Sequence, residues 1–271
     1  MPSFFYQIIR NSYFGRRKGY ETLGTYEDIF LRYGNAAQAL GVGFAGKTAL
    51  EVGCGDQIFT ALFLLAGGCG KVALVDPKLN SYGDAARFCG AVSAFRAVRP
   101  DFSMPDGEVR ERVLCYNGLN EIPGAFNGST DFIFTNVVLE HFHDLDVFFS
   151  AARRLLADGG VSFNTVDLSD HTYHIFRRFK ATQSLSYRNA LNHLRYSNKA
   201  FAFINDPKCF MNRHLLPAYG EKAAKHGLKC QIKELSSLGR SAPIHKDIAG
   251  GLGGGGENGL YATLFEMFLQ K

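Results

Sequence analysis

The stretch Thr48-Ala-Leu-Glu-Val-Gly-Cys-Gly-Asp56 decides the fold. Its apolar residues predict a buried strand, and Gly53 and Gly55 permit positive φ and close approach of a ligand to the backbone, because they carry no Cβ. A second apolar run, Lys71-Val-Ala-Leu-Val-Asp76, ends in a carboxylate. The separation suits a side chain that reaches a ribose diol, so the pattern predicts a site for a nucleoside.

Predicted strands and helices alternate through the rest of the chain. We predict helices over about 57–66, 81–98 (capped by Ser81), 145–156 and 214–226, and strands over about 48–53, 71–76, 112–116, 131–136, 161–166, 228–235 and 260–269. This alternation predicts an α/β fold with a Rossmann-like, seven-stranded, mostly parallel sheet and helices on both faces. The last strand is expected to be antiparallel, and a helical insertion is expected after strand five.

Polar and glycine-containing segments follow the predicted strands at their carboxyl ends, which lie along one edge of a parallel sheet. These segments are Gly53 to Asp56, Asp76, Asn117 to Gly118, Asn136 to His141, and Asp167 to His171. We therefore expect one ligand site at this edge.

Glu51-x-Gly53-x-Gly55 resembles motif I of the class I S-adenosylmethionine-dependent methyltransferases, with Gln57 in place of their usual third glycine. Residues 130–141 are similar to motif IV of the enzymes that act on small molecules. The resemblance covers about residues 46–235 and implies S-adenosyl-L-methionine as the cofactor and S-adenosyl-L-homocysteine as the product. It implies that Asp76 binds the ribose and that Glu51 helps to hold the methionine amino end. The predicted cofactor-binding residues are Glu51, Gly53, Cys54, Gly55, Asp56, Asp76, Asn117, Gly118, Asn136 and Val137.

A narrower resemblance rests on Val166-Asp-Leu-Ser-Asp-His171, Leu194-Arg-Tyr-Ser197 and Asn212-Arg213. These motifs are similar to a bacterial branch that is associated with saccharide or natural-product modification. In that branch, the Asp-His pair and the Asn-Arg pair are expected to face the acceptor. Phe201 stands about where relatives often have Trp, so this chain departs from the branch there.

Two histidines are candidates for the general base that a hydroxyl acceptor requires, since a neutral hydroxyl is a poor nucleophile. His171 follows Asp170 just past strand five, and His141 follows Glu140 just past strand four. We predict Asp170, His171 and His141 as catalytic residues for O-methylation. The alternative for either histidine is a structural hydrogen bond or a cofactor contact, because residues adjacent in sequence need not touch.

The basic charge of the chain is concentrated in the predicted insertion. Residues 168–215 contain eight Lys or Arg and two acids, a net charge of +6, so the rest of the chain carries −1 of the total of +5. This favours a small-molecule or glycan acceptor that is anionic, and a solvated helical surface is the alternative. The predicted acceptor-binding residues are His174, Arg177, Arg178, Asn212 and Arg213.

We divide the chain into four predicted segments. An N-terminal helical cap covers 1–45, and the cofactor-binding α/β core covers 46–167. The basic helical insertion, expected to lie over the acceptor, covers 168–215, and residues 216–271 complete the core. At 271 residues with 46% hydrophobic content, one such core can be buried.

Several other functions are disfavoured. No apolar run reaches the roughly 18 residues of a membrane span, and six scattered cysteines favour reduced thiols in a cytoplasmic chain. No metal-site pattern is present, so no metal is expected. Asn-Pro-Pro-Tyr and Pro-Cys motifs are absent from the sequence, so no nucleic-acid acceptor is expected. A nicotinamide oxidoreductase is an alternative, but its glycine turn would need a small residue at the position of Ile58. A non-catalytic cofactor-binding module is a second alternative. The sequence does not determine the oligomeric state.

Overall fold

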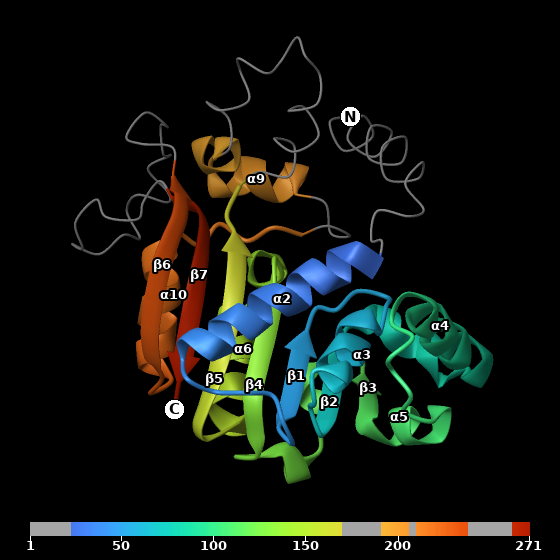
Figure 1. The fold of residues 1–271 in the computed structure, drawn as a ribbon. Helices are drawn as coiled ribbons and strands as arrows, with labels where there is room; N and C mark the ends of the chain where they lie inside the picture. Colours follow the sequence, from blue (N-terminus) through green and yellow to red (C-terminus); the bar gives the residue numbers. More distant parts are fainter. Residues whose placement is uncertain (1–22, 170–190, 206–209, 238–261) are drawn as a thin grey trace.

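The computed structural model describes residues 23–169, 191–205, 210–237 and 262–271, which form a seven-stranded sheet with helices on both faces (Figure 1). The strand order is β3-β2-β1-β4-β5-β7-β6. The strands are β1 (Thr48–Val52), β2 (Lys71–Val75), β3 (Val113–Tyr116), β4 (Thr130–Asn136), β5 (Leu156–Asp167), β6 (Lys229–Ser237) and β7 (Ala262–Gln270). β7 runs antiparallel to both β5 and β6, and β1 to β5 pair in parallel. The predicted fold class, including its antiparallel last strand, is therefore confirmed.

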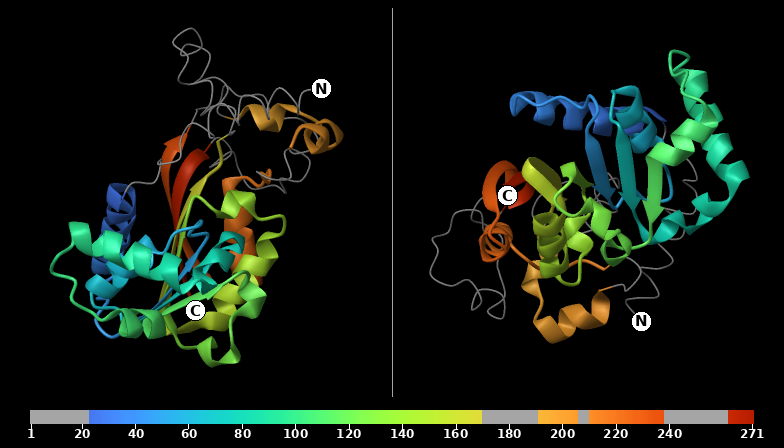
Figure 2. Two further views of the ribbon diagram at one scale, coloured as in Figure 1. Left: turned by 90° about the vertical axis from the view of Figure 1, so that its right-hand side faces the viewer. Right: turned by 90° about the horizontal axis from the view of Figure 1, so that it is seen from below.

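Helices cover the two faces of the sheet, as the view from below in Figure 2 shows. Those described are α2 (Leu23–Ala39), α3 (Phe59–Ala66), α4 (Ala85–Val98), α5 (Asp106–Arg112), α6 (Leu145–Leu155), α9 (Asn198–Ile204) and α10 (Leu216–Lys225), and short 3-10 turns lie at Pro77–Gly83, Leu119–Glu121, Gly124–Phe126, Leu139–His141 and Asn192–Arg195. Helices α2, α3 and α4 pack on one face, and α6 and α10 pack on the other. No helix within the described ranges is long and apolar enough to cross a bilayer.

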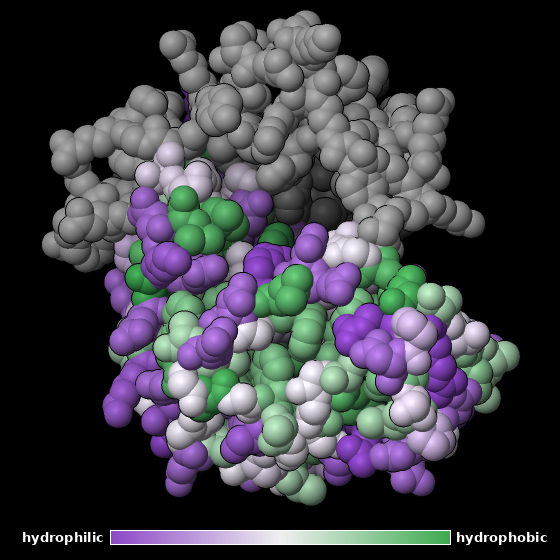
Figure 3. Space-filling view, in the orientation of Figure 1, coloured by the Kyte–Doolittle hydropathy of each residue, from purple (hydrophilic) through white to green (hydrophobic). Residues whose placement is uncertain are grey.

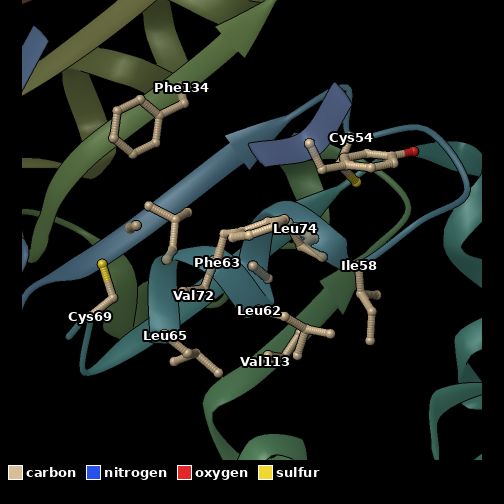
Figure 4. Packing of buried hydrophobic residues seen from close by; sticks show 14 of the residues in the cluster. Cys54, Ile58, Leu62, Phe63, Leu65, Cys69, Val72, Leu74, Val113 and Phe134 are labelled. Carbon is tan, nitrogen blue, oxygen red and sulfur yellow. The ribbon is translucent and has the colours of Figure 1, made fainter. Parts of the chain in front are cut away.

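Alternate residues of the central strands are buried in different clusters, which is why each strand reads as a nearly continuous apolar run. In β4, Phe132 and Phe134 contribute to the cluster beneath α2 and α3, whereas Ile133 contributes to the cluster beneath α6 and α10. Figure 4 shows Phe63 of α3 within the first cluster. Burying a side chain of this size contributes about 1.5–3 kcal/mol. On the outside, hydrophilic and hydrophobic residues are mixed across the face in Figure 3.

Strand β5 begins earlier than the sequence predicts. We expected a helix to end at 156 and a turn at 158–160, but β5 already pairs with Thr130 at Leu156 and shifts register before Phe132. Gly159 has φ +79°, and a Cβ on Gly160 would lie 2.8 Å from the carbonyl oxygen of Thr130. The two glycines thus permit an irregular strand start where a loop was predicted.

One helix prediction needs correction, and one helix was missed. Ser81 does not cap α4, because residues 77–83 form a 3-10 turn and the Asp84 side chain accepts a hydrogen bond from the backbone N–H of Ala86. Helix α5 was not predicted. It spans seven residues, too few for a periodic signal, and Glu108 pairs with Arg112 one turn later at 2.6 Å.

The strand order changes direction between β1 and β4, and ligands of open α/β sheets bind at the carboxyl end of such a switch point. In Figure 1 the arrows of β1, β4 and β5 point toward the edge over which α9 lies. Residues 1–22 of the predicted N-terminal cap and residues 170–190 and 206–209 of the predicted insertion lie outside the described residues. The four-segment division stays a prediction.

Candidate functional site

The turn after β1 is shaped by two glycines in the left-handed region. Gly53 has φ +82° and Gly55 has φ +73°. A Cβ on Gly53 would overlap the side chain of Val138, so the absence of a side chain lets the segment after β4 pack directly on the glycine turn. We call residues 136–142 the β4 turn. The contact between the two turns lies at the switch point, where a ligand is expected.

Asp76 follows β2 and closes the glycine turn. One carboxylate oxygen accepts a hydrogen bond from the backbone N–H of Gly55 at 3.0 Å, and the other accepts from the N–H of Lys78 at 2.9 Å. A carboxylate oxygen accepts two hydrogen bonds, so each oxygen retains one acceptor site. Two acceptor sites side by side fit the two hydroxyls of a ribose.

Glu51 and Cys54 lie deeper than the rest of the predicted cofactor set. The Glu51 side chain accepts a hydrogen bond from the Tyr33 hydroxyl of α2 at 3.2 Å, and the residue is 3% exposed. Burial, with the charges of Glu51 and Asp76, raises the pKa of the Cys54 thiol well above its ordinary value, so this cysteine stays protonated at neutral pH.

Asp56, Asn117 and Gly118 lie at the rim of the same edge. Asp56 is exposed, and the guanidinium of Arg87 donates to its backbone carbonyl at 2.9 Å. The backbone N–H of Asn117 donates to the Glu121 carboxylate at 3.0 Å, just after β3. A Cβ on Gly118 would lie 2.6 Å from the side chain of Asn120. Whether they bind the cofactor stays a prediction.

The β4 turn begins with a strained residue. Asn136 is the last residue of β4, and Val137 has φ +57°, a conformation that a β-branched residue rarely adopts. The backbone N–H of Val137 donates to the Thr165 carbonyl of β5 at 2.8 Å, which helps to hold this conformation. Strain of this kind costs about 1–3 kcal/mol and clusters at functional sites.

His141 is held in one orientation by the segment before α10. Its Nδ1 lies 2.7 Å from the carbonyl oxygen of Phe210. A carbonyl only accepts hydrogen bonds, so we assign the proton to Nδ1 and the lone pair to Nε2. Burial, reinforced by the charge of Lys78, lowers the pKa of His141 against the opposing effects of Phe210 and Asp167, so the imidazole is neutral at pH 7.

Asn212 and Arg213, both predicted to bind the acceptor, make contacts within the protein. The Asn212 side-chain amide donates to the carbonyls of Leu139 and Phe142 at 2.8 and 3.1 Å, which ties it to the β4 turn. The guanidinium of Arg213 donates to Asn198 at 3.1 Å and to the carbonyl of Tyr196, and it stacks on Phe201 at 4.7 Å. These contacts hold both side chains in place, and whether either also binds the acceptor stays a prediction.

The remaining candidates, namely Asp170, His171, His174, Arg177 and Arg178, lie outside the described residues. Within the described ranges, no three His, Cys, Asp or Glu side chains converge in a way that could hold a metal ion. Sequence reasoning missed the roles of Tyr33, Phe210 and Glu140 at this edge. The first two come from distant segments and give no local signal, whereas Glu140 was noted only as the neighbour of His141.

Comparisons with known proteins agree with this geometry. The family model of the methyltransferase domain matches residues 26–222, and the chain therefore belongs to this methyltransferase family. Its cofactor is S-adenosyl-L-methionine. This membership sets aside the nicotinamide alternative. Ile58, at the position where a nicotinamide-binding turn would need a small residue, is fully buried beside α3. A search of curated proteins found no match.

Solved structures with similar folds include an S-adenosylmethionine-dependent methyltransferase from Mesorhizobium loti, at 12% identity and a TM-score of 0.49, covering 88% of this chain and 96% of that chain. A phosphoethanolamine N-methyltransferase 2 from Haemonchus contortus has 16% identity and a TM-score of 0.48, with coverage of 88% and 52%. The geranyl diphosphate C-methyltransferase of Streptomyces coelicolor A3(2) has 17% identity and a TM-score of 0.46, with coverage of 87% and 76%. Similarity at this level says nothing about the acceptor.

Proposed function

We propose that this methyltransferase methylates a hydroxyl group on a small anionic acceptor, such as a saccharide or a natural product. The observation that carries the proposal is the orientation of His141, whose Nδ1 is bonded to the Phe210 carbonyl. The bound cofactor supplies a methyl group already activated on a cationic sulfur. The protein has to align the acceptor and remove the proton of a hydroxyl nucleophile.

A neutral imidazole with its lone pair on Nε2 suits that second task. The pKa of His141 is lowered chiefly by burial, so the base form is present at neutral pH. The β4 turn that carries His141 packs against the glycine turn through Val138 and Gly53. This contact supports a location beside the cofactor site. His171, outside the described residues, is the alternative base.

The preference for an anion rests on charge. The basic insertion places the exposed residues Arg195 and Lys199 around α9, which lies over the carboxyl edge of the sheet (Figure 1). Arg177 and Arg178 belong to the same insertion but lie outside the described residues. Positive charge around a cleft attracts anionic ligands and speeds their association. Arg213 contributes by holding α9 in place.

The test replaces His141 with Asn, whose amide can still donate to the Phe210 carbonyl but cannot act as a base. We expect turnover to fall about 10²- to 10⁴-fold, the usual contribution of a general base, while the cofactor Kd stays unchanged. His171→Ala is assayed in parallel, and His226→Asn, at the Asp146 ion pair, is the control that should keep wild-type turnover. The assay is mass spectrometry of methylated products across acceptors with hydroxyl, amine and carbon nucleophiles.

Methylation of only nitrogen or carbon would overturn the proposed reaction. Full turnover of His141→Asn together with a loss in His171→Ala would move the base to His171. Tight cofactor binding without any product across the panel would instead favour the non-catalytic module.

A further inference from the structure

Glu140 is the most unusual side chain at the site. It is 1% exposed, and within the described part of the chain neither carboxylate oxygen makes a hydrogen bond of normal geometry, although the backbone N–H groups of Glu140 and Asp167 lie near enough to interact with it. An ionised carboxylate buried in this way is strongly disfavoured, and the group normally takes up a proton instead. The methyltransferase mechanism described above does not use this residue.

Among the described residues, the groups that act on the Glu140 carboxyl include no Lys or Arg. This carboxyl is close enough to Asp167 at the end of β5 and to Tyr219 of α10 to interact electrostatically with both, and the pKa of the Tyr219 hydroxyl is raised chiefly by burial. His141, the next residue, is neutral. Burial, with the charge of Asp167, raises the pKa of Glu140 well above its ordinary value against the opposing effect of the backbone N–H groups of Glu140 and Asp167. A raised pKa favours the neutral, protonated form of the carboxyl in the ligand-free protein.

The position of Glu140 is fixed with respect to the cofactor turn. Its backbone carbonyl accepts the N–H of Asn212 at 2.7 Å, and Val138, two residues earlier, contacts Gly53. The carboxyl thus belongs to the turn that packs on the glycine turn at the switch point. A cationic group bound at this switch point would lie beside the turn that carries Glu140.

We propose that Glu140 is the charge-compensating residue for the sulfonium cofactor: it releases its proton when S-adenosylmethionine binds and regains one when the methyl group has left. A nearby opposite charge favours the ionised carboxylate. The product carries a neutral thioether, so that reason disappears after transfer. Glu140 thereby makes the protein prefer the cofactor over its product. This inference rests on the cofactor and is independent of the acceptor class.

The protons balance over one cycle. On cofactor binding, the Glu140 O–H bond breaks and the proton goes to solvent. During transfer, the acceptor lone pair forms the new bond to the methyl carbon, and the C–S electron pair stays on sulfur. The proton that the acceptor loses is matched by the one that Glu140 regains, so one proton is released per methyl group, and its release occurs at binding.

The test is isothermal titration calorimetry at about pH 7 in buffers with different heats of ionisation, which counts protons released on binding. For the wild type we expect close to one proton per S-adenosylmethionine and none for S-adenosylhomocysteine. Glu140→Gln is neutral and nearly isosteric, and it should release none with either ligand. It should bind the cofactor about 10-fold more weakly and the product with nearly unchanged affinity. Glu111→Gln, an exposed site, is the matched control and should resemble the wild type.

Equal proton release with both ligands, or the same release from Glu140→Gln as from the wild type, would overturn the inference. If Glu140→Gln fails to fold, infrared difference spectra of the wild type decide instead. The carbonyl band of a protonated carboxyl should disappear on addition of S-adenosylmethionine and persist with S-adenosylhomocysteine. A failure of the hydroxyl proposal would leave all of these outcomes unchanged.

Discussion

Asp76 combines a structural and a binding function in one carboxylate. By accepting the N–H groups of Gly55 and Lys78, it fixes the glycine turn in the shape that exposes backbone to a ligand. The acceptor sites that remain on its two oxygens face no competing main-chain donor among the described hydrogen bonds. Removing the charge of Asp76 should therefore weaken cofactor binding and loosen the glycine turn together.

We predict that Asp76→Asn raises the cofactor Kd about 10- to 100-fold. One carboxylate oxygen becomes an amide, which cannot accept from a ribose hydroxyl or a backbone N–H, and a hydrogen bond to a charged group contributes about 1.5–3 kcal/mol. Calorimetric titration with S-adenosylhomocysteine measures the change. Asp101→Asn, an exposed partner of Arg99 away from the site, should leave Kd unaltered. Unchanged affinity in Asp76→Asn would remove Asp76 from the cofactor site.

Gly53 occupies a position where a side chain should destabilise the protein. Gly53→Ala places a Cβ at φ +82° and into the Val138 side chain, so we expect a loss of about 1–3 kcal/mol in the free energy of unfolding. Gly83→Ala, where a Cβ meets open space, is the matched control. Chemical denaturation of both variants, and of Gly53→Ala combined with Val138→Ala, separates overlap from backbone strain. If shortening Val138 recovers no stability, the overlap is not the cause.

Among the elements, α9 depends on a contact with a distant segment. Arg213 binds the N-terminal end of α9 through Asn198 and Tyr196 and stacks on Phe201, while the neighbouring Asn212 holds the β4 turn. Two successive residues thus connect the described part of the insertion with the turn that carries His141. An isolated helix of seven residues is marginal in water, so α9 needs this support.

We predict that Arg213→Ala raises the acceptor KM about 10-fold without changing the cofactor Kd, because α9 loses its position over the acceptor side. Hydrogen exchange followed by mass spectrometry should be faster across α9 and unchanged in α3. Arg195→Ala, which removes an exposed charge nearby, should raise KM without altering exchange. An equal loss of acceptor and cofactor binding in Arg213→Ala would indicate general misfolding and contradict this role.

Element length explains which parts of the fold could be predicted from sequence. β1, β2 and β4 were placed within a residue or two because each is an apolar run bounded by turn or polar residues. The seven-residue α5 and the 3-10 turn at 77–83 have no periodic signal, and the early start of β5 depends on the close approach of Gly160 to Thr130.

Across the whole molecule, local sequence features predict the cofactor edge of the site but not the contacts that tertiary packing creates there. Glycine turns and strand-end carboxylates are local features, so the cofactor edge was predictable from convergence at the carboxyl ends. The bonds from Phe210 to His141 and from Tyr33 to Glu51 join segments 69 and 18 residues apart, and they depend on tertiary packing. Burial of Glu140 likewise follows from α10 and β5 meeting the β4 turn, which no local pattern encodes.

Glu140 should also set the pH dependence of stability of the ligand-free protein. Its ordinary pKa is about 4.5, and burial raises the pKa in the folded state. Above about pH 4.5 the unfolded chain loses this proton while the folded protein keeps it. The folded state then binds more protons, and its stability falls as pH rises, by up to about 1.4 kcal/mol per pH unit from this group.

We therefore predict that the stability difference between Glu140→Gln and the wild type grows in favour of the variant as pH rises from about 4.5, until the folded-state pKa of Glu140 is passed. The variant carries no proton to lose, so subtracting the two curves cancels other titrating groups, such as Asp146, whose pKa is lowered by Lys222 and His226. Urea denaturation at a series of pH values measures the difference, and Glu111→Gln should give a flat one. A flat difference for Glu140→Gln would mean that the carboxyl is already ionised in the folded protein, and the proton release on cofactor binding would then have no source.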